Sequence, residues 1–259
     1  MSGPAVYLLG QAQVNWGVVS KWLKGLGVKT PRYALERQGS EGEVLCELAG
    51  RRCYKSFEPG LNPNVTKVRE SSREYHGNIL ASGHGSVLEH FWTTWAFEGV
   101  SRIFTHELIR HRVGTAFSQE SLRYVRASDY QVWEPPNMPE EWGPNFTAAE
   151  LGTKNQVREC EGVIDEQESF KTKKELTSAL RRILPQGMGT GIVFSANMRA
   201  LRYIVGERTS EAAEIEMRVV FDQVARICKA EWPLIFQDME PKETGPDLPW
   251  AWVFQYPKV

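Results

Sequence analysis

The polar side chains best suited to chemistry lie between residues 101 and 126, a stretch that reads SRIFTHELIRHRVGTAFSQESLRYVR. Arg110, His111 and Arg112 place two guanidiniums and an imidazole next to one another, and a small, hydroxyl-rich segment follows them. Guanidinium, hydroxyl and backbone N–H groups are donors suited to phosphate and pyrophosphate. The stretch therefore predicts a site for a phosphorylated ligand. The alternative is a solvated helix end whose cations are favoured by the helix dipole.

The positions of the histidines and the absence of other nucleotide-binding and catalytic motifs favour the site for a phosphorylated ligand over a solvated helix end. All five histidines lie within 36 residues, between His76 and His111. The sequence contains no GxGxxG that opens a βαβ unit, no GxxxxGK[ST], no HExxH and no GxSxG. The cysteines are not spaced CxxC, so no metal site is expected from them, and a chain of this length needs no disulfides: they are Cys46, Cys53, Cys160 and Cys228. A phosphorylated ligand must therefore be held by scattered arginines and loop amides.

Four ordered segments carry a family resemblance. The triplet 110–112, followed after eight residues by Ser121-Leu122-Arg123-Tyr124, resembles the signature of flavin-dependent thymidylate synthases, in which the gap is usually seven residues. Upstream, the segment 84–90, an aromatic strand and Glu98 to Arg102 are similar to the family pattern. Downstream, segments 181–185, 197–199 and 208–211 follow in the family's order, so the resemblance covers about residues 45–238.

The resemblance implies a specific reaction. The family binds FAD and converts dUMP to dTMP, with methylenetetrahydrofolate as carbon donor and NADPH as reductant, and it uses no cysteine nucleophile. Its members are typically homotetramers with sites shared between subunits. The fold expected is α+β: a single catalytic domain over residues 1–259, with a mainly antiparallel sheet packed by long helices.

By position, the resemblance also assigns residues to ligands. The expected FAD contacts are His84, Ser86, Glu89, Arg110, His111, Arg112, Asn197 and Arg199. The expected nucleotide contacts are Glu107, Ser121, Leu122, Arg123, Arg181 and Arg208. The catalytic candidates are Arg208 and Ser121, and further candidates near the folate or the base are Arg102, Tyr54 and Lys174. Each has a structural alternative: His84 and His90 as satisfied structural histidines at the start of a strand, Glu89 as an ion-pair partner, Ser121 as a turn hydroxyl.

Three hypotheses about function stay open. The first is a thymidylate synthase that acts on dUMP. The second is a specialised UMP or dUMP C5-methylase of nucleoside antibiotic biosynthesis. The eight-residue gap, Glu107 and two departures from the family pattern near the flavin, Ala212 and Tyr203, argue for it. The third is a non-catalytic nucleotide-binding module whose arginines sense a phosphorylated ligand.

Local patterns predict the elements that position these residues. Residues 91–98 are aromatic and Thr-rich, which predicts a strand. Ser101 is a candidate N-cap for a helix over 102–112. Apolar spacings of four and three predict a helix over 198–208 and another from about residue 213 to Pro233.

The remaining segments are less regular. Residues 68–81 and 155–180 indicate helices, and the Pro- and Asn-rich segment 131–155 indicates a long loop. The segment 241–259 indicates an irregular tail that packs on its own surface or on a neighbouring subunit. Strands mixed irregularly with long helices favour the α+β class.

The composition argues against several classes of partner. The 259 residues are 41% hydrophobic and 24% charged, with a formal net charge of −1. These values are typical of a globular protein and give no reason to expect a nucleic-acid polymer as partner. No apolar run approaches the length of a membrane span, and the start lacks the basic region of a signal peptide, so we expect no membrane partner and a cytoplasmic location.

Overall fold

The computed structural model describes residues 3–29 and 39–259. Within them the protein is α+β, with a mainly antiparallel sheet and many helices, which confirms the coarse fold class. The four-stranded sheet has the order β1-β2-β4-β3 and consists of β1 (Ala5–Gln11), β2 (Trp92–Ser101), β3 (Thr115–Gln119) and β4 (Gly189–Asn197). A separate antiparallel pair is formed by β5 (Met239–Lys242) and β6 (Ala251–Phe254).

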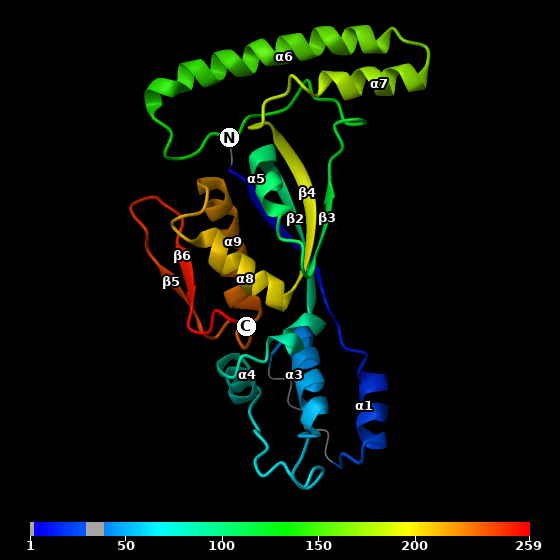
Figure 1. Cartoon of the computed structure of the whole chain (residues 1–259), viewed down its shortest axis with the longest axis vertical. Helices are drawn as coiled ribbons and strands as arrows, with labels where there is room; N and C mark the ends of the chain where they lie inside the picture. Colours follow the sequence, from blue (N-terminus) through cyan, green and yellow to red (C-terminus); the bar gives the residue numbers. More distant parts are fainter. Residues whose placement is uncertain (1–2, 30–38) are drawn as a thin grey trace. The chain divides into compact units, whose positions relative to one another are not determined.

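The helices are distributed along the whole described chain (Figure 1). They are α1 (Trp16–Gly25), α3 (Glu41–Tyr54), α4 (Ser72–Ala81), the 3₁₀ helices η1 (Gly85–His90) and η2 (Glu140–Trp142), α5 (Arg102–Leu108), α6 (Gly143–Asp165), α7 (Phe170–Leu180), α8 (Met198–Thr209) and α9 (Ile215–Glu231). No helix in residues 3–29 or 39–259 has the length and apolar character needed to cross a membrane.

The chain divides into two compact units. Unit 1 contains Met1–Tyr7, Ala96–His111 and Phe117–Phe194, and unit 2 contains Leu8–Trp95, Arg112–Ala116 and Ser195–Val259.

An aromatic core positions α5 in unit 1. Phe194 stacks on Phe97 and on Phe117, with ring centroids 5.8 and 5.5 Å apart, and Phe97 meets Phe104 of α5 edge-on at 5.7 Å. Ser101 caps α5, because its Oγ accepts a hydrogen bond from Phe104 N at 3.1 Å. The Ser101 bond confirms the expected cap. The ring contacts hold β2 and α5 at the beginning of the polar stretch 101–126, and β3 within it, against β4.

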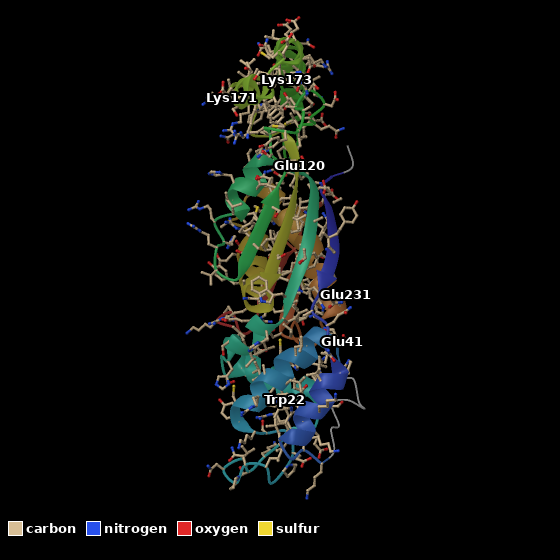
Figure 2. The ribbon with its side chains drawn as sticks, turned by 90° about the vertical axis from the view of Figure 1, so that its right-hand side faces the viewer. Trp22, Glu41, Glu120, Lys171, Lys173 and Glu231 are labelled. Atoms are coloured by element: carbon tan, nitrogen blue, oxygen red, sulfur yellow. The ribbon has the colours of Figure 1, made fainter. Side chains whose placement is uncertain are left out.

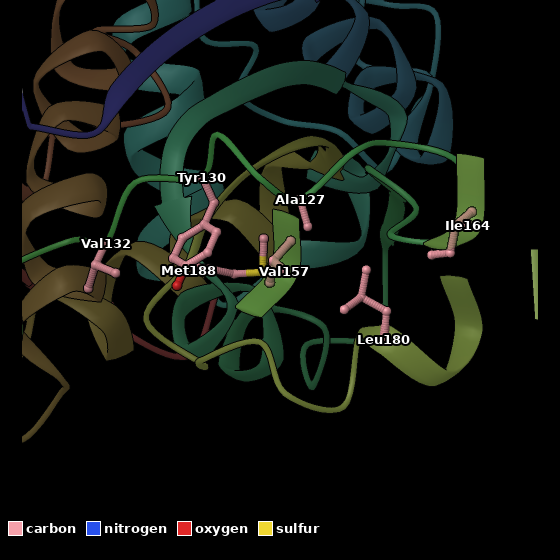
Figure 3. Close-up of a cluster of buried hydrophobic side chains, with 7 residues drawn as sticks. All are labelled: Ala127, Tyr130, Val132, Val157, Ile164, Leu180 and Met188. Carbon is pink, nitrogen blue, oxygen red and sulfur yellow. The ribbon is translucent and has the colours of Figure 1, made fainter. Parts of the chain in front are cut away.

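The hairpin of α6 and α7 has its own buried cluster in unit 1 (Figures 1 and 3). The cluster contains Ala127, Tyr130, Val132, Val157, Ile164, Leu180 and Met188. The buried carboxylate of Glu161 on α6 accepts a hydrogen bond from Ala127 N at 3.0 Å. This bond ties the chain that follows the SLRY motif to α6.

Unit 2 is centred on Trp232, which is fully buried. Its ring meets Phe91 and Trp95 edge-on, at 5.4 and 5.9 Å between centroids, and its Nε1 donates to Gln11 Oε1 at 2.8 Å. The buried Glu43 carboxylate accepts hydrogen bonds from Leu234 N at 2.8 Å, among others, so its charge is compensated.

Helices α1 and α3 also belong to unit 2. The carboxylate of Glu41 accepts hydrogen bonds from Trp16 Nε1 at 2.7 Å and from Val14 N at 3.0 Å (Figure 2). Trp22 of α1 packs edge-on against Phe57, with ring centroids 5.6 Å apart. These contacts hold α1 on α3.

The strand and the two apolar-periodic helices are confirmed as β2, α8 and α9, and residues 68–81 contain α4. The side chains at 91, 93, 95 and 97 are all buried, as the shared face of the strand predicts.

Two expectations were wrong in extent. Residues 143–155 are helical, not a loop: α6 begins at Gly143 with Pro144 in its first turn, where the missing N–H costs nothing. Residues 155–180 are helical as expected, with a break where α6 ends at Asp165 and Ser169 caps α7. The tail 241–259 is not wholly irregular, because part of it forms the β5–β6 pair. Trp252 lies in β6, and Trp250 directly precedes this strand.

The helix expected over 102–112 ends at Leu108. The C-cap Ile109 still bonds four residues back, to Thr105 O at 3.1 Å. The two N–H groups after it bond three residues back: Arg110 N to Glu107 O at 3.3 Å and His111 N to Leu108 O at 3.1 Å. The chain therefore tightens into turns, and the triplet 110–112 follows the helix instead of forming its last turn.

Candidate active site

The start of α8 gathers part of the expected flavin group in unit 2. Asn197 is the N-cap of this helix: its Oδ1 accepts a hydrogen bond from Ala200 N at 2.9 Å. Its backbone N donates to Gly114 O at 3.0 Å. In the first turn, Arg199 Nη1 lies 2.7 Å from Glu89 Oε1 of η1. Both side chains of this pair are close to half exposed, at 46% and 47%, so the pair is accessible to a ligand and contributes little to stability.

Two glycines allow the neighbouring backbone to approach this helix start. A Cβ on Gly85 would lie 2.9 Å from Arg199 Nε, and a Cβ on Gly114 would lie 2.5 Å from Asn197 Nδ2. Gly114 also has a φ of +70°, a conformation that favours glycine. The helix η1 therefore lies against Arg199, and the segment that carries Arg112 lies against Asn197.

His84 and Ser86 flank Gly85 at the beginning of η1, and both are exposed. The His84 ring stacks on Tyr54 of α3, with centroids 6.1 Å apart and an interplanar angle of 11°. The donors present here, a guanidinium, an imidazole, a hydroxyl and an amide around a close backbone approach, fit the pyrophosphate of a flavin dinucleotide.

In unit 1, Arg102 lies at the first position of α5. Its Nη2 donates to Glu120 O at 3.1 Å, while its buried Nε has no hydrogen-bond partner within the described residues. Burial lowers the pKa of Arg102, the charge of Arg181 lowers it further, and Glu120 opposes both effects. The guanidinium remains charged at neutral pH. An anion beside it would supply the acceptor that Nε lacks.

Ser121 begins a tight turn in the SLRY motif. Its Oγ accepts a hydrogen bond from Arg123 N at 3.4 Å, and its carbonyl accepts from Tyr124 N at 3.0 Å. The turn projects Arg123 toward α7, where Arg123 Nε donates to Ser178 Oγ at 3.2 Å. Leu122 packs against the buried cluster of Figure 3, which fixes the turn from the other side.

Further cations come from α7 and its end. The ammonium of Lys174 lies 5.3 Å from the centroid of the Tyr124 ring, and its hydrogen bond and charge lower the pKa of that phenol. Arg181, the C-cap of α7, is exposed. Lys171 and Lys173 lie on the same helix (Figure 2). Lys174 beside Tyr124 and Arg181, whose charge acts on Arg102, thus place positive charge near the turn of Ser121, as a phosphate site requires.

The structure thus places the sequence-predicted residues in two groups. The flavin group at the start of α8 unites Glu89, Asn197 and Arg199, with His84 and Ser86 on η1 and Arg112 beside Gly114. The nucleotide group in unit 1 unites Ser121, Leu122 and Arg123 with Arg102, Lys174 and Arg181.

The remaining candidates lie at or after the ends of α5 and α8. Arg110, His111 and the half-buried Glu107 belong to unit 1 around the end of α5. Arg208 lies in the last turn of α8 in unit 2 and is partly buried, as its place on the apolar stripe predicts.

Sequence reasoning missed Gly85, Gly114 and Ser178. Gly85 lies between two candidate residues and Gly114 directly follows the cationic triplet, so a glycine next to expected phosphate ligands was a usable signal. Ser178 offered none, because it lies 55 residues from the arginine that it contacts.

Two of the four cysteines are buried where a thiolate is disfavoured. All four are free, and two of them, Cys46 and Cys228, are buried. Burial raises the pKa of both thiols above the usual range, so they stay protonated at neutral pH.

Comparison with known proteins gives the family. Residues 35–234 match the sequence model of the family described as thymidylate synthase complementing protein. The flavin-dependent thymidylate synthase of Corynebacterium diphtheriae is 32% identical over 217 residues, which cover 80% of this chain and 83% of that protein. Those of Mycobacterium marinum and Mycolicibacterium gilvum are 35% and 36% identical over 210 and 209 residues, each covering 77% of this chain and 80% of the relative. With this similarity extending across both groups of site residues, the chain belongs to the flavin-dependent thymidylate synthase family.

Proposed function

We propose that the protein converts dUMP to dTMP, with methylenetetrahydrofolate as carbon donor, NADPH as reductant and FAD as cofactor. The observation that carries this proposal is the cationic turn at Ser121, where Arg123 is aimed at Ser178 and Arg102 keeps a buried, unpaired Nε. A nucleotide phosphate supplies the acceptors that this cluster lacks. The family to which the chain belongs supplies the reaction.

The residues at the start of α8 hold the flavin. Arg199 exchanges its exposed contact with Glu89 for the pyrophosphate, and Asn197 is held in place by its cap to Ala200. His84 and Ser86 offer further donors from η1, and Arg112 offers a guanidinium from the adjoining segment. The family resemblance assigns Arg110 and His111, which follow α5 in unit 1, to the flavin as well. Once bound, FAD supplies the redox chemistry, while the protein orients and polarises the reactants.

The nucleotide is held by two kinds of contact. Ser121, Arg123 and Arg181 bind the phosphate, while Leu122 keeps the turn packed against the hydrophobic cluster. Arg208 donates to the uracil oxygens and stabilises negative charge that develops on the ring. Glu107 accepts from the sugar or the base.

We also propose a homotetramer that works in the cytoplasm, with residues 1–259 as one catalytic domain. The α6–α7 hairpin supports the assembly, because Leu151, Val163 and Phe170 are 56%, 54% and 71% exposed. A pocket of about 340 Å³ with an almost wholly apolar lining opens on the same hairpin. Apolar surface of this kind is typical of an interface. Light scattering tests the assembly, and a fully active monomer would contradict it.

UMP is a second candidate substrate. One observation favours it: eight residues separate Arg112 from Ser121, and the extra residue falls in the stretch that contains β3. An extra residue in this stretch gives the nucleotide site room for a 2′-hydroxyl with a bridging water.

A single reconstitution experiment tests the proposal. Purified protein is expected to bind FAD, with a flavin absorbance spectrum, and to form dTMP from dUMP when methylenetetrahydrofolate and NADPH are added. Arg181→Ala should raise KM for dUMP. Arg182→Ala is the matched control, because Arg182 is exposed and its Nη1 is already bonded to Ser178 O at 2.8 Å. Nucleotide binding without turnover would leave the non-catalytic module as the correct hypothesis.

A further inference from the structure

The C-terminal segment 235–259 lies beyond the part of the chain that matches the family, yet it is built around a buried arginine of α8. Arg202 is 2% exposed. Its Nη1 and Nη2 donate to the two carboxylate oxygens of Asp238, at 2.8 and 3.0 Å. The same guanidinium also donates to the carbonyls of Ile235 and Tyr256. One side chain thus joins α8 to both ends of the segment.

Strand β6 covers the same face of α8. The guanidinium of Arg202 lies 4.5 Å from the centroid of the Phe254 ring. One turn further along, a Cβ on Gly206 would lie 3.4 Å from Phe254 Cδ2, so the absence of a side chain lets the ring approach the helix. At the end of the helix, Thr209 Oγ1 accepts a hydrogen bond from Trp252 N at 2.9 Å. Spacings of four and three residues place all these contacts on one helix face.

The other residues of this helix include the proposed ligand contacts. Arg199 is in its first turn and Arg208 in its last, and Asn197 is its N-cap. A rotation or slide of α8 would therefore displace flavin and nucleotide contacts together. Displacements on the order of 1 Å are enough to lower activity strongly.

The Arg202–Asp238 ion pair is better suited to fix the orientation of α8 than to stabilise the fold. A buried ion pair gains little over an apolar pair of similar volume, because desolvation offsets its attraction. A bidentate guanidinium–carboxylate pair, however, permits only one relative orientation. The buried thiol of Cys228 and the ring of Phe236, 5.8 Å from the guanidinium, complete a low-dielectric surrounding that keeps this orientation strict.

We infer that the Arg202–Asp238 pair, which joins α8 to the C-terminal segment, is a positioning clamp that sets α8, and with it Arg199 and Arg208, for binding of FAD and the nucleotide. Arg202 touches neither ligand and is a positioning residue. The inference rests on the proposed function, because it needs Arg199 and Arg208 to be ligand contacts.

The test compares Arg202→Met and Asp238→Asn with a matched control. Arg218→Met is that control: Arg218 is also buried and also holds the C-terminal segment, through Thr244 Oγ1 at 2.6 Å and Pro249 O at 3.2 Å, but from α9. All variants are measured as full chains, well below their melting temperatures, for FAD affinity by flavin fluorescence and for KM and kcat with dUMP.

We expect both clamp variants to weaken FAD binding and raise KM for dUMP by about tenfold, which is the scale of coupling through a packed element. Arg202→Lys, which keeps the charge but loses the fork, should restore part of this loss. Arg218→Met should lower the melting temperature with nearly unchanged FAD affinity and KM. If Arg202→Met does not fold, Asp238→Asn decides alone, since its amide oxygen can still accept from Arg202 and Tyr256 N.

Two further variants separate the clamp from the proposed function. If Arg199→Ala and Arg208→Ala weaken ligand binding while the clamp variants lose only thermal stability, as Arg218→Met does, the clamp is refuted and the proposed site stands. If Arg199→Ala and Arg208→Ala bind FAD and dUMP like the wild type, the site assignment is wrong and the clamp is overturned with it.

Discussion

Replacing Gly114 by alanine should damage both the stability of unit 2 and its flavin site. Gly114 has a φ of +70°, and its new Cβ would lie 2.5 Å from Nδ2 of Asn197. The left-handed conformation costs an alanine roughly 1–2 kcal/mol. Displacing the Asn197 side chain from its cap on α8 costs about 0.5–2 kcal/mol more. The free energy of unfolding should therefore fall by about 1.5–4 kcal/mol, which for a chain of this size lowers the melting temperature by roughly 3–16 °C.

Gly60→Ala is the matched control. Gly60 has a φ of +88° and no atom within 4 Å of an added Cβ, so alanine there incurs only the backbone cost. Thermal melting by circular dichroism measures both variants, and flavin fluorescence measures their FAD affinity. Because Arg199 follows Asn197 by two residues, Gly114→Ala should also weaken FAD binding by about tenfold or more, whereas Gly60→Ala should not.

A double-variant cycle identifies the cause. Asn197→Ala removes the atom that the new Cβ meets, so Gly114→Ala should cost much less in that background, close to the cost measured at Gly60. Equal losses for Gly114→Ala and Gly60→Ala in the wild-type background would refute the argument that the two residues are in forced proximity.

Four further outcomes are expected. Ser178→Ala, which removes the acceptor of Arg123 Nε, should raise KM for dUMP by about threefold to tenfold with kcat and melting temperature nearly unchanged; an unchanged KM would remove Ser178 from the site. Lys174→Met should raise the pH at which the Tyr124 phenol ionises, because Lys174 lowers that pKa in the wild type; ultraviolet pH titration measures the shift, and identical titrations would contradict the contact. Replacing all four cysteines by serine or alanine should preserve dTMP formation, and loss of activity traced to one thiol in a folded protein would overturn the assignment. Wild type should methylate UMP at a measurable rate, and deletion of one residue from 113–117 should shift the ratio of kcat/KM for dUMP and UMP; no UMP turnover, or an unchanged ratio, would make the extra residue a surface adjustment.

Local sequence patterns were sufficient for elements whose stability depends on neighbouring residues. The apolar spacing along α8 and α9 and the aromatic alternation of β2 predicted those elements, because burial of one face follows from residues three, four or two positions apart. The same reasoning failed over 143–155, where Pro144 and the asparagines suggested a loop. There the helix is stabilised by side chains further along, such as Val157, whose burial depends on tertiary contacts.

The sequence by itself determined the chemical inventory of the site: a cationic triplet, a serine–arginine turn and later arginines, in an order that indicates the family. Only the tertiary structure decided which of them meet. Arg199 pairs with Glu89, 110 residues away, and Arg123 reaches Ser178, 55 residues away. Arg202, which no sequence argument singled out, is bound to Asp238, 36 residues on. A periodic pattern records which face of an element is buried, but such pairings depend on how distant elements pack, because a guanidinium bonds whatever acceptor the fold places beside it.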